Sequence, residues 1–160
     1  MAFAYTLPLR VVQAVLSIII LGLSAYVIDT WNGLFNDGWT PSSVNFMLFT
    51  SIWTLLAVAY LVITPTRFPS LAHKWAILAV EAITMIFWFA AWVAVAALWG
   101  DIGCRSRGGA CGAGTAAIVF GAIEWLAFVA TTIMAALHIR NTGRHNPHHD
   151  PNMEVRQVGV

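Results

Sequence analysis

Charged residues are what this sequence has least of. Only 9% of its 160 residues are charged, while 59% are hydrophobic, and a soluble domain carries roughly 25% charge. The formal net charge is +1, so nucleic acid is not an expected partner. With so few charges the surface of a water-soluble domain could not be covered, and we therefore expect the chain to lie in a membrane.

Motifs for catalysis and for metal binding are also missing. The sequence has no phosphate-binding glycine loop, no Ser/His/Asp arrangement and no zinc signature, so neither an enzyme nor a metal site is predicted. His145, His148 and His149 lie near the C-terminus without cysteines or a rigid framework around them, which favours a solvated segment over a metal site. No cofactor is expected, apart from bound lipid or sterol.

Long apolar runs are what the sequence has in abundance. Residues 76–98 read AILAVEAITMIFWFAAWVAVAAL, and about 20 apolar residues suffice to cross a bilayer core of ~30 Å. Three similar runs accompany it, so we predict an all-α, integral membrane four-helix bundle in residues 1–140. The remaining residues, 141–160, are polar and are expected to form a disordered cytoplasmic tail. The predicted helices span about residues 9–28, 43–63, 71–99 and 113–138.

Prolines and turn-forming pairs set the expected helix ends. Pro8 suits the first turn of a helix, where its missing N–H costs nothing. Segment 29–41 contains Asn-Gly and Asp-Gly pairs, which predict a loop. Leu34, Phe35 and Trp39 make this loop amphipathic, so we expect it to lie along the membrane surface. The Thr64-Pro65 pair is expected to end the second helix after Ile63, because a residue before proline avoids the α region. A glycine-rich loop is expected over 100–112.

The distribution of Lys and Arg predicts the orientation. Four helices place both termini on one side, and six of the eight Lys and Arg residues fall on that side. Arg105 and Arg107 fall on the other side. Basic residues accumulate on the cytoplasmic side of membrane proteins, so we expect a multi-pass protein with both termini in the cytoplasm.

The only two cysteines, Cys104 and Cys111, both fall in the third connection, on the predicted outer side. That compartment is oxidising, so the pair predicts a disulfide that closes a glycine-rich loop. A redox dithiol is the alternative interpretation. Such sites usually have Cys-x-x-Cys spacing, and the longer spacing here favours the structural disulfide.

Glu81 is one of two acids inside the apolar runs, where a charge is costly and usually has a role. It lies about two turns, roughly 9 Å, from the cytoplasmic end of its helix. Arg10 and Gln13 lie at a similar depth on the first helix and share one face of it. We therefore expect these two side chains to neutralise and hydrogen-bond the Glu81 carboxylate.

Glu124, the second acid, lies near the middle of the bilayer. Ser17 and Thr54 share its depth, and no Lys, Arg or His does. We therefore expect Glu124 to keep its proton and to donate to a hydroxyl or a carbonyl. Two interpretations of the acids stay open: interhelical hydrogen bonds worth about 1 kcal/mol each, or stations on a proton or cation path.

Large aromatic and small side chains recur at helical spacings. The tryptophans Trp88, Trp92 and Trp99 lie near one face of the third predicted helix, as a surface for sterol or a partner helix or as bundle packing. Rows of small residues let helix backbones approach closely, within one bundle or between copies of the chain. The small residues are Ala113, Ala117 and Gly121 in the fourth helix and Ala90 and Ala94 in the third.

Four segments carry a family resemblance: LPLRVVQ, SVNFMLFTSIWTLLAVAYL, EAITMIFWFAAWVAVAAL and AIVFGAIEWLAFVATTIMAALH. With the Cys104/Cys111 pair and Glu124-Trp125, they resemble the MARVEL domain over about residues 8–140. This is the tetraspanning module of the myelin-and-lymphocyte, physin, gyrin and occludin proteins. The segments look most like its fungal branch, which includes the non-classical export protein of eisosome-associated plasma-membrane compartments.

The resemblance implies a location and a role. It implies residence in the plasma membrane and a part in membrane apposition, lateral membrane organisation or vesicle traffic. It also implies association with sterol- or sphingolipid-rich domains and self-association into a homo-oligomer. It implies no catalytic residue.

Overall fold

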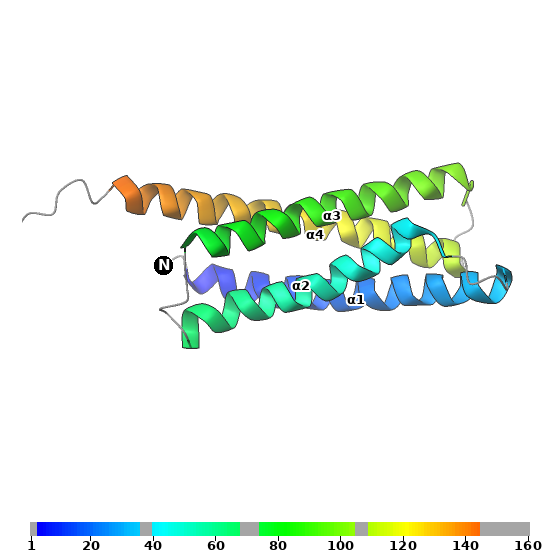
Figure 1. Cartoon of the computed structure of the whole chain (residues 1–160), viewed down its shortest axis with the longest axis horizontal. Helices are drawn as coiled ribbons and strands as arrows, with labels where there is room; N and C mark the ends of the chain where they lie inside the picture. Colours follow the sequence, from blue (N-terminus) through cyan, green and yellow to red (C-terminus); the bar gives the residue numbers. More distant parts are fainter. Residues whose placement is uncertain (1–2, 36–39, 68–73, 105–108, 145–160) are drawn as a thin grey trace, which may run out of the picture.

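The computed structural model describes residues 3–35, 40–67, 74–104 and 109–144. Within these ranges every regular element is a helix: α1 (Phe3–Phe35), α2 (Ser42–Arg67), α3 (Lys74–Asp101) and α4 (Gly109–Arg144). Each helix contains an apolar stretch long enough to cross a membrane. The predicted all-α membrane bundle of four helices is therefore confirmed (Figure 1).

The four helices are antiparallel and form a ring in chain order. Helix α1 packs against α2 and α4, and α3 packs against the same two neighbours. Helices α1 and α3 therefore face each other across the core. The start of α1 and the finish of α4 lie at one end of the bundle, called the terminal end below (Figure 1). The opposite end, where α3 finishes and α4 begins, is called the disulfide end.

Core positions on each helix alternate at spacings of three and four residues. This is the repeat by which helices interlock along a narrow seam. In α3 the buried series is Glu81, Thr84, Trp88, Ala91 and Val95. In α1 it is Gln13, Ser17, Ile20, Ser24 and Val27, and in α4 it is Ala117, Gly121, Glu124, Phe128 and Thr131.

Polar side chains lie inside the bundle and apolar ones outside. Eleven polar or charged side chains are buried among the described residues. Large apolar side chains face outward on all four helices, with exposed fractions of 57% at Val11 and Leu126, 58% at Ile86 and 65% at Leu56. Such a surface would be costly in water, but it matches the hydrocarbon of a bilayer.

Helix α1 is longer than predicted at both ends. It begins at Phe3 and continues to Phe35, so the loop expected from Asp29 is wrong for residues 29–35. Pro8 lies inside the helix rather than in its first turn. In the distal part, Thr30 Oγ1 donates to the Tyr26 carbonyl at 2.8 Å. A helix in lipid satisfies its own backbone groups, and this outweighs the turn preference of the Asn-Gly pair.

Helices α2, α3 and α4 also pass their predicted ends. Helix α3 reaches Asp101 rather than Trp99, and its predicted first residues, 71–73, lie outside the described residues. Helix α2 continues through Pro65 to Arg67, because a proline removes only one backbone hydrogen bond of its helix and tertiary context can tolerate this. Helix α4 begins at Gly109 and reaches Arg144, so the predicted bounds 113–138 are too narrow. Its last turns run past the other helices at the terminal end (Figure 1). The disordered tail was predicted for 141–160; residues 141–144 are helical, and 145–160 lie outside the described residues.

Candidate functional site

An ion pair crosses the core at the terminal end. Arg10 of α1 forms a salt bridge with Glu81 of α3, and these helices face each other across the bundle. Arg10 Nη1 also donates to Gln13 Oε1 at 2.9 Å, and Thr131 Oγ1 donates to Glu81 Oε2 at 2.6 Å. We call these four residues the Arg10 cluster. It joins α1, α3 and α4 through side chains alone.

The Arg10 cluster lies at the edge of the buried core. The Glu81 side chain is fully buried, whereas that of Arg10 is 11% exposed. A buried ion pair is stable only when additional hydrogen bonds satisfy its remaining groups, and Gln13 and Thr131 supply them. The structure thus brings together the three residues that were predicted to lie at one depth. The predicted hydrogen bond from Gln13 to the Glu81 carboxylate is wrong, because Gln13 bonds Arg10 and Thr131 takes the second carboxylate oxygen.

Glu124 has a different environment. Ser17 Oγ donates to Glu124 Oε1 at 3.1 Å, and both side chains are buried. Ser17 is thus the predicted hydroxyl partner, but it is the donor, so the predicted donation by Glu124 is wrong for this bond. Glu124 Oε2 is buried and has no hydrogen-bond partner among the described residues. Thr54, expected at the same depth, is not bonded to this carboxyl. Its hydroxyl donates to the Thr50 carbonyl at 2.8 Å and accepts from Trp88 Nε1 at 2.9 Å.

The two acids belong to separate hydrogen-bonded groups. Thr131, which holds Glu81, lies seven residues after Glu124 on α4, or about 10 Å along the helix axis. The Phe128 side chain lies between them on that face and is fully buried. Glu81 and Glu124 therefore occupy different layers of the core, with an aromatic ring between their levels on α4.

The three tryptophans of α3 do not form an outer face. Trp88 is fully buried and Trp99 is 6% exposed, so the interpretation as a sterol or partner surface is wrong for both. Both rings belong to the apolar core, and their indole N–H groups have acceptors there, Thr54 for Trp88 and the Cys111 carbonyl for Trp99. Trp92 is partly buried and packs against Phe89 and Trp125, with ring centroids 6.0 and 6.3 Å away.

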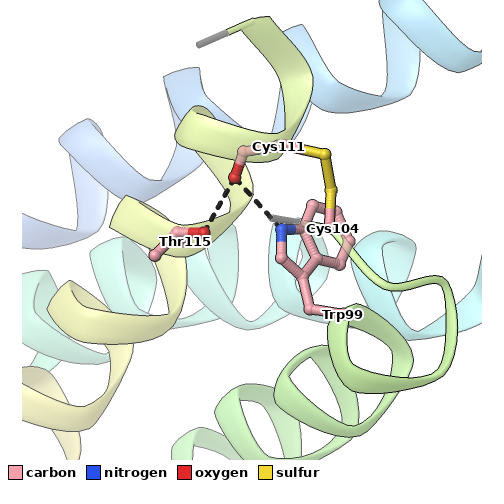
Figure 2. Close-up of a disulfide and its surroundings, with 4 residues drawn as sticks. All are labelled: Trp99, Cys104, Cys111 and Thr115. Carbon is pink, nitrogen blue, oxygen red and sulfur yellow. Dashed lines mark hydrogen bonds between the residues drawn. A yellow bond between two sulfur atoms is a disulfide. The ribbon is translucent and has the colours of Figure 1, made fainter. Parts of the chain in front are cut away.

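The disulfide end is closed by covalent and aromatic contacts. Cys104 and Cys111 form a disulfide, with their Cα atoms 5.5 Å apart. Figure 2 shows the Trp99 indole N–H and the Thr115 hydroxyl converging on the Cys111 carbonyl, at 3.1 and 2.8 Å. The Trp31 ring stacks on Trp99 with centroids 6.3 Å apart.

Backbone geometry places the first cysteine of this disulfide. Gly103 follows α3 with φ at 63°, a conformation that glycine adopts without strain. The amides of Gly103 and Cys104 donate to the carbonyls of Gly100 and Trp99, at 3.3 and 3.2 Å. These two bonds are a Schellman motif, which caps a helix end, and they turn Cys104 toward α4.

Small residues of α4 allow close packing inside the bundle. A Cβ atom at Gly114 would lie 1.8 Å from the Trp99 ring, so only glycine fits there. A Cβ at Gly121 would lie 3.2 Å from Trp92 Cβ. Of the other predicted small residues, Ala117 is buried, Ala113 and Ala94 are partly buried, and Ala90 faces outward.

Sequence reasoning missed three residues of these groups. Thr131 could have been found, because it lies seven residues after Glu124 and so shares its helix face. Trp31 could not, because the predicted helix ended before it. Gly114 carried no signal that distinguished it from its small neighbours. Within the described ranges, no group of three or more His, Cys, Asp or Glu side chains could hold a metal ion.

Comparison with protein families gives one result. A family model described as MARVEL, membrane-associating domain, matches residues 3–134. The match covers parts of all four helices, the Arg10 cluster and the disulfide. Searches of curated proteins and of solved structures found no match.

Proposed function

This chain belongs to the MARVEL family of membrane-associating domains, and we propose that it is a non-enzymatic scaffold that organises a membrane. It is an integral, multi-pass membrane protein. As proposed, copies of the chain associate through their outer helix faces and cluster or curve the lipid around them. Sterol- or sphingolipid-rich regions of the plasma membrane are the proposed setting, in compartment organisation or vesicle traffic.

The observation that carries this proposal is the division between inside and outside. Ionisable side chains in the described part of the core bond to each other or to hydroxyl groups inside the bundle. Outward positions along the spans carry apolar side chains such as Leu56, Ile86 and Leu126. The protein therefore offers its surroundings a lipid-like surface, and van der Waals packing with lipid or other helices is what such a surface can do.

The proposed orientation places both termini in the cytoplasm. Six of the eight Lys and Arg residues belong to the terminal end or the segments next to it, and cytoplasmic segments are enriched in these residues. A glycosylation sequon introduced within residues 36–39 should be modified during passage through the secretory pathway. Modification of a sequon placed after residue 145 instead would reverse the orientation.

The scaffold proposal can be tested by electron microscopy of the full chain in sterol-containing liposomes, with the protein density increased stepwise. Arrays, rings or tubes are expected. Dispersed single bundles in undeformed vesicles would contradict the proposal. Ala90→Trp on α3 and Ala25→Trp on α1 change outward faces on opposite sides of the ring. If one face makes the lateral contacts, only the variant on that face should disperse the arrays.

A small proton- or cation-coupled transporter is the second candidate function. The observation in its favour is that two carboxyl side chains, Glu81 and Glu124, are fully buried in a membrane bundle, where acids commonly mark ion paths. Ion flux in proteoliposomes that disappears in Glu124→Gln would support it. Ion flux at the background level in both the wild type and the variant would contradict a transporter, and the scaffold would stay the proposed function.

A further inference from the structure

Five buried polar side-chain atoms lack a hydrogen-bond partner in the described part of the chain. Two of them belong to Gln13, in the Arg10 cluster, and to Glu124, which lies deeper in the bundle. Gln13 accepts from Arg10 through Oε1, so its Nε2 is the end that needs an acceptor, and no described residue supplies one. Glu124 accepts from Ser17 through Oε1, and its Oε2 is likewise without a partner in the described part of the chain. Both side chains have 0% exposure. A buried polar atom that is left unpaired destabilises the fold, because it loses its hydrogen bonds to water and gains none in the protein.

The two atoms belong to neighbouring layers of the core. Gln13 lies four residues before Ser17, one turn along the same buried face of α1, and Ser17 holds the Glu124 carboxyl. Gln13 Nε2 is a hydrogen-bond donor. Glu124 Oε2 accepts a hydrogen bond, or donates one when it carries a proton. Because Ser17 already donates to Oε1, a proton on this carboxyl resides on Oε2. A water molecule needs two to four polar partners of this kind.

We propose that Gln13 and Glu124 hold an internal water molecule, and that Glu124 exchanges its proton through this water with the terminal end of the bundle only. The proton passes from Glu124 Oε2 to the water, and a proton from the water replaces it, so the carboxyl is unchanged and no net charge moves. This inference goes beyond the scaffold function and does not depend on it.

Polar side chains connect the proposed water to the solvent at the terminal end of the bundle, but not at the disulfide end. From the proposed water, Gln13 leads to Arg10, whose side chain is partly exposed. The ionisable side chains of the described interior, apart from Glu124, are Arg10 and Glu81, and both lie on this side. Toward the disulfide end, the apolar Ile20 follows Ser17 on the buried face of α1. Beyond Ile20 lie the buried Ser24 hydroxyl, which has no partner in the described part of the chain, then further apolar side chains and the Trp31–Trp99 stack. These apolar side chains are Ile20, Val27, Val44, Val95 and Ala117.

Infrared spectroscopy of the full chain in phosphatidylcholine vesicles tests the proposal, with deuterated water as the probe. The carboxyl C=O band of Glu124 is identified by its loss in Glu124→Gln, and it should shift as the proton is replaced. In Gln13→Met, which keeps the length of the side chain, exchange should slow by about tenfold because the water loses a partner. Ser24→Ala, on the disulfide side of Ile20, is the matched control and should exchange at the wild-type rate.

Three results would overturn the proposal. They are the absence of a carboxyl band that Glu124→Gln removes, equal exchange rates in Gln13→Met and wild type, and slowing in Ser24→Ala as large as in Gln13→Met. If Gln13→Met does not fold, water-edited solid-state NMR of the wild type decides instead. The Gln13 side-chain amide should receive magnetisation from water early. The Trp88 indole, bonded to Thr54, should receive it late, and equal build-up at both sites would contradict the internal water.

Discussion

The two ends of this bundle are closed by different chemistry. At the terminal end, charged and polar side chains meet across the core, and each balances another. At the disulfide end, a covalent bond, a ring stack and a glycine without room for a methyl group close the bundle. In the Arg10 cluster, the loss of one side chain leaves another one buried without its partner. At the disulfide end, the loss of one contact leaves the other contacts in place.

The difference predicts where a single substitution does most damage. Removing one partner of a buried ion pair leaves an uncompensated charge in a medium of low dielectric constant. Removing a disulfide leaves neutral thiols or hydroxyls at the edge of the bundle. We therefore expect the terminal end to be the more sensitive to a single change, although the disulfide end holds the covalent bond.

The largest expected effect is at Glu81. Glu81→Leu leaves the Arg10 guanidinium inside the bundle without its carboxylate, and the free energy of unfolding should fall by about 3–5 kcal/mol. Unfolding in mixed detergent micelles, followed by circular dichroism, measures it. The double variant Arg10→Met/Glu81→Leu removes both charges and should recover most of the loss. If the double variant is as unstable as Glu81→Leu, the unpaired charge of Arg10 does not cause the loss of stability.

Depth along the helices was enough to predict the ion pair at the terminal end, but not Thr131 or the partner of Gln13. In an antiparallel membrane bundle, the distance of a residue from its helix end sets its depth. Arg10 and Gln13 could therefore be matched with Glu81, and Ser17 with Glu124, without knowing which helices touch. Thr54 shows the limit of this reasoning. It has the right depth, but its hydroxyl is used by the Thr50 carbonyl and the Trp88 indole.

The disulfide end was less predictable, because its helix ends were misplaced. The Asn-Gly pair, which favours a turn in a soluble chain, does not stop α1, and helix continues through Trp31. Without that extra length, the partner of Trp99 could not be identified. The close contact at Gly114 depends on the rotamer of Trp99, which no spacing rule supplies. Turn preference and residue spacing describe one segment at a time, whereas the contacts of Trp99 are made with two other helices, at Trp31 of α1 and Gly114 of α4.

The second largest effect should come from the disulfide. Cys104→Ser/Cys111→Ser should lower the free energy of unfolding by about 2–3 kcal/mol, since the unfolded chain regains the freedom of a closed loop. The thermal midpoint should fall in the same way when the wild type is reduced with dithiothreitol. The reductant should not change the midpoint of the double serine variant. A wild-type midpoint that does not respond to reductant would contradict the comparison between the ends.

Gly114→Ala should have the next effect at the same end. The new methyl group would meet the Trp99 ring at 1.8 Å, so the ring must move and lose its bond to Cys111. Overpacking of this kind costs about 1–3 kcal/mol. Gly22→Ala is the control, because nothing lies within 4 Å of its added Cβ, and alanine favours a helix. If both variants unfold at the same midpoint, the Trp99 ring does not set the packing at this end.

The smallest expected effect compares the two ends with one substitution in one helix. Thr131→Val removes the hydroxyl that donates to Glu81 Oε2 at 2.6 Å inside the Arg10 cluster. Thr115→Val removes an exposed hydroxyl that donates to the Cys111 carbonyl at 2.8 Å, an oxygen that also accepts from Trp99. The first change should cost about 1 kcal/mol, within the range measured for hydrogen bonds between membrane helices. The second should leave the free energy of unfolding unchanged, because Cys111 keeps a partner. Equal losses would mean that the hydroxyls contribute through local helix geometry, and the Arg10 cluster would then be held by its ion pair alone.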